Sequence, residues 1–153
     1  SWDKARVRLG RPGMALTFNG VAQGWAADQL ARIAGAHDLS DLLIDSGEQR
    51  ALGSRNWQAG IAGPDGVLLR RMMLRDRALA TSSGMGTRIG PGGDRPHILD
   101  PKRDRLPHGT VAVSAPLAAL ADGLSTAFCV MEATSVRSAL AGLPGCRLEI
   151  LHA

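Results

Sequence analysis

Hydrophobic and polar positions along this chain follow patterns that predict three helices. From Val21 to about Ala36, apolar residues recur at spacings of three and four, which is typical of a helix with one buried face. A second helix is predicted to begin at Pro116 and to run from Leu117 to about Met131, again with an apolar stripe. A third is expected from Ser135 to Leu143, because Pro144-Gly145 then ends the helical pattern.

Short runs of β-forming residues, separated by Gly, Pro, Asp and Asn, fill most of the remaining chain. The expected strands are Met14–Phe18, Asp41–Asp45, Gln49–Leu52, Trp57–Ile61, Val67–Leu74, Ala78–Thr81, His97–Leu99, Thr110–Ser114 and Arg147–Leu151. Gly63-Pro64-Asp65-Gly66 predicts a hairpin between two of these strands, as part of a β-meander. The order of elements predicts an α+β fold with a mixed or mainly antiparallel sheet and about three helices, rather than a doubly wound fold.

Composition indicates a single globular domain over residues 1–153. The 153 residues are 44% hydrophobic and 21% charged, with a mean hydropathy of -0.03, which does not fit a disordered tail. No apolar run reaches the about 20 residues that a membrane-spanning helix needs. The chain opens with Ser-Trp-Asp-Lys, which is neither a signal peptide nor an initiating Met, so we expect a fragment that lacks an upstream segment.

Charge and cysteine content restrict the function only weakly. The net charge of +4 comes mainly from arginines that are spread along the chain, and aromatic residues are few. A basic nucleic-acid binder is therefore a weak alternative, because base stacking needs aromatic residues near basic ones. Cys129 is expected to be a buried free thiol, and Cys146 lies in a Pro-Gly turn without metal-ligand spacing.

The most informative polar cluster lies in the second predicted helix. Asp122, Ser125 and Thr126 are spaced i, i+3 and i+4, so that they share one face within an apolar run. A buried carboxylate must be paired, hydrogen-bonded or metal-bound, and a carboxylate beside a hydroxyl suits Mg²⁺. The alternative is that the helix starts later, with Asp122 in its first turn as a cap or dipole partner and the hydroxyls bonded back to carbonyls.

Two glycine-containing junctions could approach an anionic ligand. Asn19 is expected to cap the first helix, and Gly20 would let the backbone come close to a ligand near the first-turn amides. The stretch from Ala80 to Gly86 ends a strand in a loop rich in hydroxyls and glycine, which could wrap a phosphate through its amides. For both segments, an ordinary turn is the alternative interpretation.

A histidine precedes a short apolar run and could act as a base. His97 stands at the head of the strand expected over His97–Leu99, where its imidazole could take a proton from an attacking hydroxyl. Strand alternation would send His97 and Asp100 to opposite faces, so no His-Asp pair is implied. The alternative is a structural histidine.

Taken in order, several segments of the chain resemble the ApbE-type FAD:protein FMN transferases. The stretches that carry this resemblance are Phe18–Asp28, Asp45–Gly53, Trp57–Ile61, Ala80–Ser82, His97–Pro101 and Ala121–Ala127. Each stretch is weak alone, and their order and spacing make the match specific. Family members are about twice as long, so the resemblance implies the C-terminal half of the family fold. It also implies a missing N-terminal half, and a periplasmic or membrane-tethered location.

The resemblance also implies a reaction and a set of site residues. With Mg²⁺, FAD would be split, and its FMN part joined through a phosphoester to a Thr or Ser hydroxyl of an acceptor protein, releasing AMP. The implied metal ligands are the Gly20 carbonyl, Asp122 and Thr126. His97 would be the base, and the residues contacting FAD would be Thr17, Asn19, Gln23 and Ile98. The alternative is a flavin- or metal-binding module, or a truncated relative, that catalyses nothing.

Overall fold

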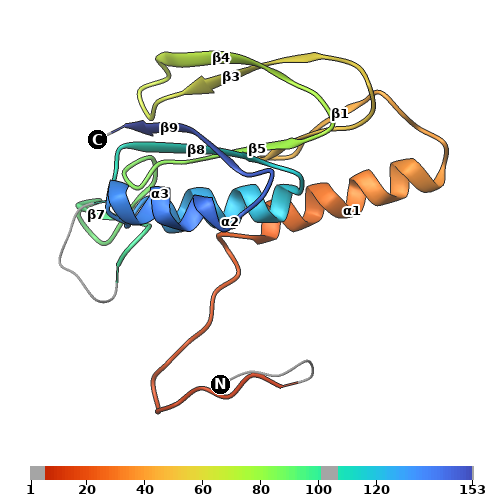
Figure 1. The fold of residues 1–153 in the computed structure, drawn as a ribbon. Coiled ribbons are helices and arrows are strands. Elements are labelled where there is room, and N and C mark those ends of the chain that lie inside the picture. The colour runs from red at the N-terminus through yellow and green to blue at the C-terminus, as the bar shows by residue number, and fades with distance from the viewer. Residues whose placement is uncertain (1–5, 101–106, 153) are drawn as a thin grey trace.

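In the computed structural model, which describes residues 6–100 and 107–152, a five-stranded sheet is covered by helices on one face and by a hairpin on the other (Figure 1). The sheet has the strand order β1-β2-β5-β8-β9, and each neighbouring pair is antiparallel. Its strands are β1 (Leu43–Asp45), β2 (Gln49–Ala51), β5 (Ala78–Ser82), β8 (Thr110–Ala115) and β9 (Arg147–His152). The predicted α+β class with an antiparallel sheet is therefore confirmed.

Three helices occur in the described part of the chain, close to the predicted positions. They are α1 (Ala22–Ala36), α2 (Ala118–Phe128) and α3 (Ala133–Ala141). Alanines fill the contact of α1 and α2 with the sheet, where Ala27, Ala80 and Ala121 are completely or almost completely buried. Such small side chains let the backbones approach closely. None of the described helices has the length and apolar character needed to cross a membrane.

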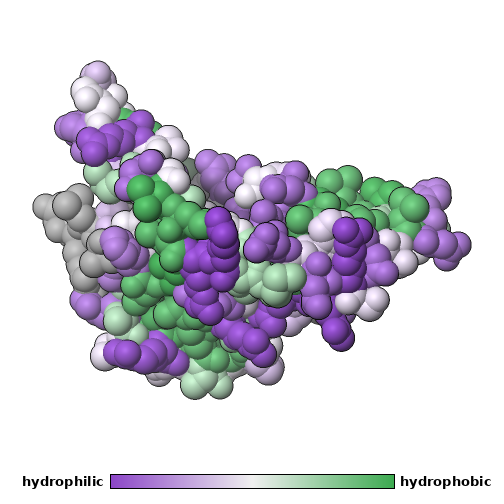
Figure 2. Space-filling view, turned by 90° about the horizontal axis from the view of Figure 1, so that it is seen from above, coloured by the Kyte–Doolittle hydropathy of each residue, from purple (hydrophilic) through white to green (hydrophobic). Residues whose placement is uncertain are grey.

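The opposite face of the sheet is covered by the hairpin of β3 (Trp57–Ala62) and β4 (Leu68–Leu74). Ile61 and Leu74 from the hairpin pack against Leu79 and Ala112 of the sheet. The other side of the hairpin faces solvent, and the view from above shows hydrophobic and hydrophilic residues interspersed there (Figure 2). The chain thus forms three layers, with the sheet in the middle.

The predicted hairpin is confirmed, but the meander around it is wrong. Within the described residues, β3 and β4 pair only with each other, and β5 joins the central sheet beside β2 and β8. The redirection follows a turn at Asp76, which adopts a positive φ of 44°. Ile61 and Leu74 of the hairpin bury their side chains against Leu79, so that the hairpin covers the face of the sheet and does not extend its edge.

Two further strand predictions are also wrong. Met14–Phe18 is not a strand, and its side chains are exposed, because the segment lies away from the sheet without a pairing partner among the described residues. The strand expected over His97–Leu99 is replaced by β7 (Arg95–Pro96), which pairs with β6 (Arg88–Ile89). The glycine-rich turn between β6 and β7 sets this earlier register, and His97 then lies in a bend.

The N-cap predicted at Asn19 is wrong as well. The helix begins two residues later than that cap would require, with Val21 at the N-cap position and no side-chain cap bond. The Phe18 carbonyl accepts the N–H groups of Val21 and Ala22 at 3.0 and 2.9 Å. A backbone turn therefore uses these donors, and Asn19 is left to face the cavity described next.

Candidate active site

A cavity of about 720 Å³ lies where the segment before α1, the end of β5, the segment after β7 and the middle of α2 meet. The eight residues singled out from the sequence all line it, namely Thr17, Asn19, Gly20, Gln23, His97, Ile98, Asp122 and Thr126. These residues come from three stretches that are far apart in the chain. The fold therefore brings together positions that the sequence could connect only by resemblance.

Asp122 supplies a buried carboxylate to this cavity. It lies in the second turn of α2, with only 4% of its surface exposed, and its Oδ2 accepts the backbone N–H of Gly24 at 3.0 Å. Burial raises the pKa of this carboxyl group, and the bond from Gly24 opposes that rise. No ion pair among the described residues includes Asp122. The carboxylate therefore lacks a cationic partner in the described part of the chain, which a bound metal ion would provide.

Of the alternative interpretation of this cluster, the later helix start is wrong, because α2 begins at Ala118 and Asp122 lies in its second turn, whereas the back-bonding is confirmed for one hydroxyl. Asp122 does satisfy a helix N-terminus, but the helix is α1, because the bonded N–H belongs to the first turn of α1. Ser125 does bond back, since its hydroxyl donates to the Asp122 carbonyl at 3.0 Å. Thr126 instead contacts Ser82, with 3.2 Å between their side-chain oxygens.

Gly20 lies directly against Thr126. A Cβ atom built on Gly20 would be 2.9 Å from Thr126 Cγ2 and 3.1 Å from Thr126 Oγ1, so only glycine lets the backbone come this close. Asp122, Thr126 and Gly20 thus line one cavity, and they carry a carboxylate, a hydroxyl and a backbone carbonyl. All three are the hard oxygen donors that Mg²⁺ prefers, so the residues present fit this cation.

Glu48 also lines the cavity, although no motif in the sequence singled it out. It lies between β1 and β2, only 6% exposed, and accepts the backbone N–H of Thr81. Burial and the nearby Asp122 carboxylate raise the pKa of Glu48 to about 8. Periodicity gave no sign of its burial, because a glutamate in a turn is usually exposed. The one available signal was its place within the stretch Asp45–Gly53 that carries the family resemblance.

His97 faces the cavity from an exposed bend. Its Nδ1 lies 3.0 Å from the Thr87 carbonyl, which can only accept, so Nδ1 carries the proton in this contact. Nε2 of the neutral ring then keeps a free lone pair. This arrangement leaves Nε2 able to take a proton from a group bound in the cavity.

The loop that follows β5 also borders the cavity. Ser83 and Gly86 of this loop line it together with Thr81 and Ser82 at the end of β5. The Ser83 hydroxyl donates to the carbonyl of Gly109, which holds the loop against the start of β8. The Ser82 hydroxyl instead contacts Ser125 and Thr126 in α2.

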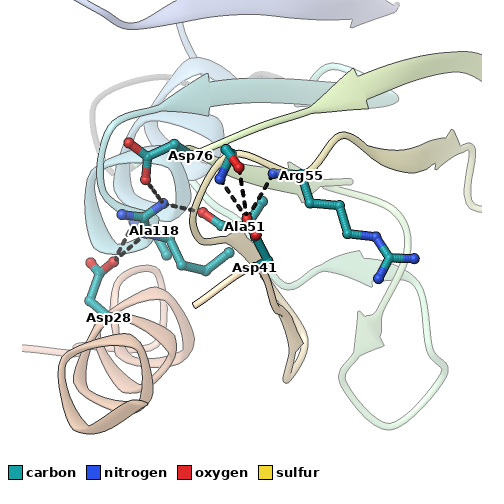
Figure 3. Close-up of polar contacts among 8 residues, drawn as sticks. Asp28, Asp41, Ala51, Arg55, Asp76 and Ala118 are labelled. Carbon is teal, nitrogen blue, oxygen red and sulfur yellow. Dashed lines mark hydrogen bonds and ion pairs between the residues drawn. The ribbon is translucent and has the colours of Figure 1, made fainter. Parts of the chain in front are cut away.

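A second polar network holds α1 and α2 in place behind the cavity. The Asp28 carboxylate accepts the backbone N–H groups of Ala118 and Ala119, both at 2.9 Å, and so caps α2 from a distance. Arg50 lies between Asp28 and Asp76, at 3.6 and 3.9 Å (Figure 3). The position of Asp122 is thereby fixed by contacts at the start of its own helix.

Comparison with known proteins gives a consistent result. The model of the ApbE family matches residues 1–148. The FAD:protein FMN transferase of Treponema pallidum is 29% identical over 159 aligned positions, which cover 91% of this chain and 44% of that protein. The crystal structure of an ApbE protein from Thermotoga maritima has a TM-score of 0.71 and 29% identity, covering 84% of this chain and 46% of the other.

A third match is the flavinyl transferase ApbE of Pseudomonas stutzeri in its apo form. It has a TM-score of 0.59 and 28% identity, with 73% of this chain and 38% of that structure covered. The chain belongs to the ApbE family, whose matched members include flavin transferases. It spans less than half the length of these relatives.

Proposed function

We propose that this chain carries the cation-binding and acceptor-activating residues of an FAD:protein FMN transferase. In the proposed reaction, a Thr or Ser hydroxyl of an acceptor protein attacks the phosphorus of the FMN part of FAD. A new phosphoester bond forms, the pyrophosphate bond to AMP breaks, and AMP leaves. The observation that supports this proposal is the convergence of Gly20, His97, Asp122 and Thr126 on one cavity.

The proposed roles follow from the chemistry of each group. The Gly20 carbonyl, Asp122 and Thr126 would hold Mg²⁺, which when bound neutralises charge on a pyrophosphate. His97 Nε2 would accept the proton of the attacking hydroxyl, because Nδ1 is occupied by the Thr87 carbonyl. Thr17, Asn19, Gln23 and Ile98, which line the same cavity, would contact FAD.

The electrostatics of the cavity support a requirement for a cation. Asp122 and Glu48 are both buried, and burial raises the pKa of each carboxyl group, so a cation bound beside them would favour their ionised forms. The pyrophosphate of FAD adds further negative charge. We therefore expect FAD to bind only when a divalent cation accompanies it.

The test is FAD binding followed by transfer. FAD fluorescence would be titrated with the chain in Mg²⁺ and in EDTA, for the wild type, Asp122→Ala and Asp122→Asn. Asn keeps an acceptor for the Gly24 N–H and removes the charge, so it separates loss of the cation from loss of the helix contact. We expect Mg²⁺-dependent binding that both variants lose. Metal-independent binding of FAD by Asp122→Ala would contradict the metal role.

A second candidate function is a flavin- or metal-binding module without turnover. The same cavity residues support it, because Gly20, Asp122 and Thr126 would hold a cation whether or not transfer follows. Incubation with FAD, Mg²⁺ and an acceptor peptide distinguishes the two by mass spectrometry. Only the transferase yields a peptide heavier by one FMN group together with free AMP.

A further inference from the structure

Three hydroxyl groups form a continuous chain beside the proposed cation site. Ser82 at the end of β5 has its Oγ 2.7 Å from Ser125 Oγ and 3.2 Å from Thr126 Oγ1, both in α2. Ser125 is completely buried and Ser82 is half-buried. Which hydroxyl donates and which accepts is therefore determined mainly by these three groups and the nearby backbone.

The direction follows from counting protons, since each hydroxyl has one proton to donate. Ser125 Oγ lies 3.0 Å from the Asp122 carbonyl, which can only accept, so Ser125 donates there. Ser125 must then accept the proton of Ser82. Because the Ser82 proton is used in this way, Thr126 is the donor in its contact with Ser82. The chain of donors runs from Thr126 to Ser82, then to Ser125, and ends on the Asp122 carbonyl.

We infer that Ser82 and Ser125 are positioning residues that turn the Thr126 hydroxyl proton toward β5 and leave the lone pairs of Thr126 Oγ1 for a divalent cation. The inference rests on the proposed function, because it requires a cation at Gly20, Asp122 and Thr126. A hydroxyl binds a cation through a lone pair, and a proton directed at the cation would oppose binding. Groups that orient a metal ligand in this way typically change metal affinity by about 10–100-fold.

The structure holds Ser82 firmly in this place. It is paired with Val111 in the central sheet, and its carbonyl lies 3.7 Å from Cys129 Sγ. The neighbouring Ser83 provides a matched control, because its hydroxyl also borders the cavity but donates to the Gly109 carbonyl. Removing the Ser83 hydroxyl should leave the chain of three hydroxyls intact.

The experiment measures binding of Mn²⁺ alone, through the electron paramagnetic resonance signal of the free ion. We expect Ser82→Ala to weaken binding by about 10-fold or more, and Ser83→Ala to bind like the wild type. Since Ser125 acts only through Ser82, the double variant Ser82→Ala/Ser125→Ala should bind no more weakly than Ser82→Ala. Such non-additivity is typical of residues in one network.

Other outcomes separate failure of this inference from failure of the proposed function. If Asp122→Asn loses Mn²⁺ binding and Ser82→Ala keeps it, the cation site stands and the positioning role is overturned. If the wild type and Asp122→Asn bind Mn²⁺ equally, the cation site is overturned, and the positioning role with it.

A measurement on the unmutated chain covers the case in which Ser82→Ala does not fold. In nuclear Overhauser spectra, the Thr126 hydroxyl proton should contact the β protons of Ser82. A stronger contact with the α protons of Gly20 would place that proton on the cavity side and overturn the inference.

Discussion

The Asp122 carboxylate in α2 accepts the backbone N–H of Gly24 in α1 at 3.0 Å, across 98 residues of sequence. A reciprocal contact lies nearby, because Asp28 in α1 accepts two N–H groups at the start of α2. Each helix therefore satisfies unpaired donors at the N-terminus of the other. The same pair of contacts fixes one oxygen of Asp122 and points the residue into the cavity, so the stability of the helix pair and the shape of the site are coupled.

The helix cap provided by Asp28 should make a measurable contribution to the free energy of unfolding. Asp28→Ala leaves the N–H groups of Ala118 and Ala119 without their acceptor and removes one of the two carboxylate partners of Arg50. We expect a loss of about 1–3 kcal/mol in the free energy of unfolding, measured in urea. Asp28→Asn keeps one acceptor oxygen and should lose less. An Asp28→Ala variant as stable as the wild type would show that water replaces this cap.

Close contact between α1 and α2 depends on Gly24. A Cβ atom at this position would lie 2.3 Å from the Ala118 carbonyl oxygen, so Gly24→Ala must push the helices apart. We expect it to reduce the free energy of unfolding by about 1–3 kcal/mol, as overpacking typically does. Gly35 in the same helix has no atom within 4 Å of a built Cβ. Gly35→Ala should therefore be neutral or stabilising by up to about 1 kcal/mol, and equal losses in both variants would refute the packing argument.

Local patterns were sufficient to predict most elements of this fold. The apolar spacing that marks α1 and α2 gave their positions to within a few residues, and the turn at Gly63–Gly66 marked the hairpin. Pairing between distant strands was not visible in these patterns. The residues of a strand do not indicate which other strand it pairs with, so the separation of β3 and β4 from the central sheet could not be predicted.

The residues of the candidate site were likewise predictable where local sequence carries the signal, and not where it depends on packing. Asp122 and Thr126 were found because helical spacing places them on one face, and Gly20 and His97 were candidates from their local sequence, but only the family resemblance connected these four residues in one site. The contact of Asp122 with Gly24 could not be found, because it depends on how α1 and α2 cross. Glu48 was missed for a related reason, since its burial depends on the folded chain, which places it beside Thr81 and Asp122.

The raised pKa of Glu48 predicts a dependence of stability on pH. Its pKa rises from 4.5 to about 8 on folding, chiefly because of burial, so the folded state holds this proton more tightly than the unfolded state. The resulting stabilisation is present below pH 4.5 and is lost as pH rises toward 8. Urea unfolding in metal-free buffer should therefore show wild-type stability falling over this range relative to Glu48→Gln. If the unfolding free energies of the two proteins changed with pH in parallel, the pH dependence would not come from Glu48.

The two cysteines should differ in reactivity. Cys129 is 1% exposed, and burial raises its pKa to about 11, whereas Cys146 is only half-buried. The thiolate is the reactive form, so a disulfide reagent at pH 8 should modify Cys146 well before Cys129 in the folded chain. Cys146→Ser should remove the fast phase, and unfolding in urea should expose Cys129. Rapid labelling of Cys129 under native conditions would show that α2 opens frequently.

The proposed role of His97 separates proton transfer from ligand binding. His97→Ala should reduce transfer of FMN to an acceptor peptide by about 100-fold or more, the usual scale for loss of a general base. Cation and FAD binding should stay close to wild type, because the proposed metal ligands are unchanged. His97→Gln can still donate to the Thr87 carbonyl but offers no basic nitrogen, so it should be as inactive as His97→Ala.

His37→Ala is the matched control, since His37 lies at the end of α1 and does not line the cavity. Transfer that survives in His97→Gln would assign His97 a role in holding the loop rather than in accepting the proton.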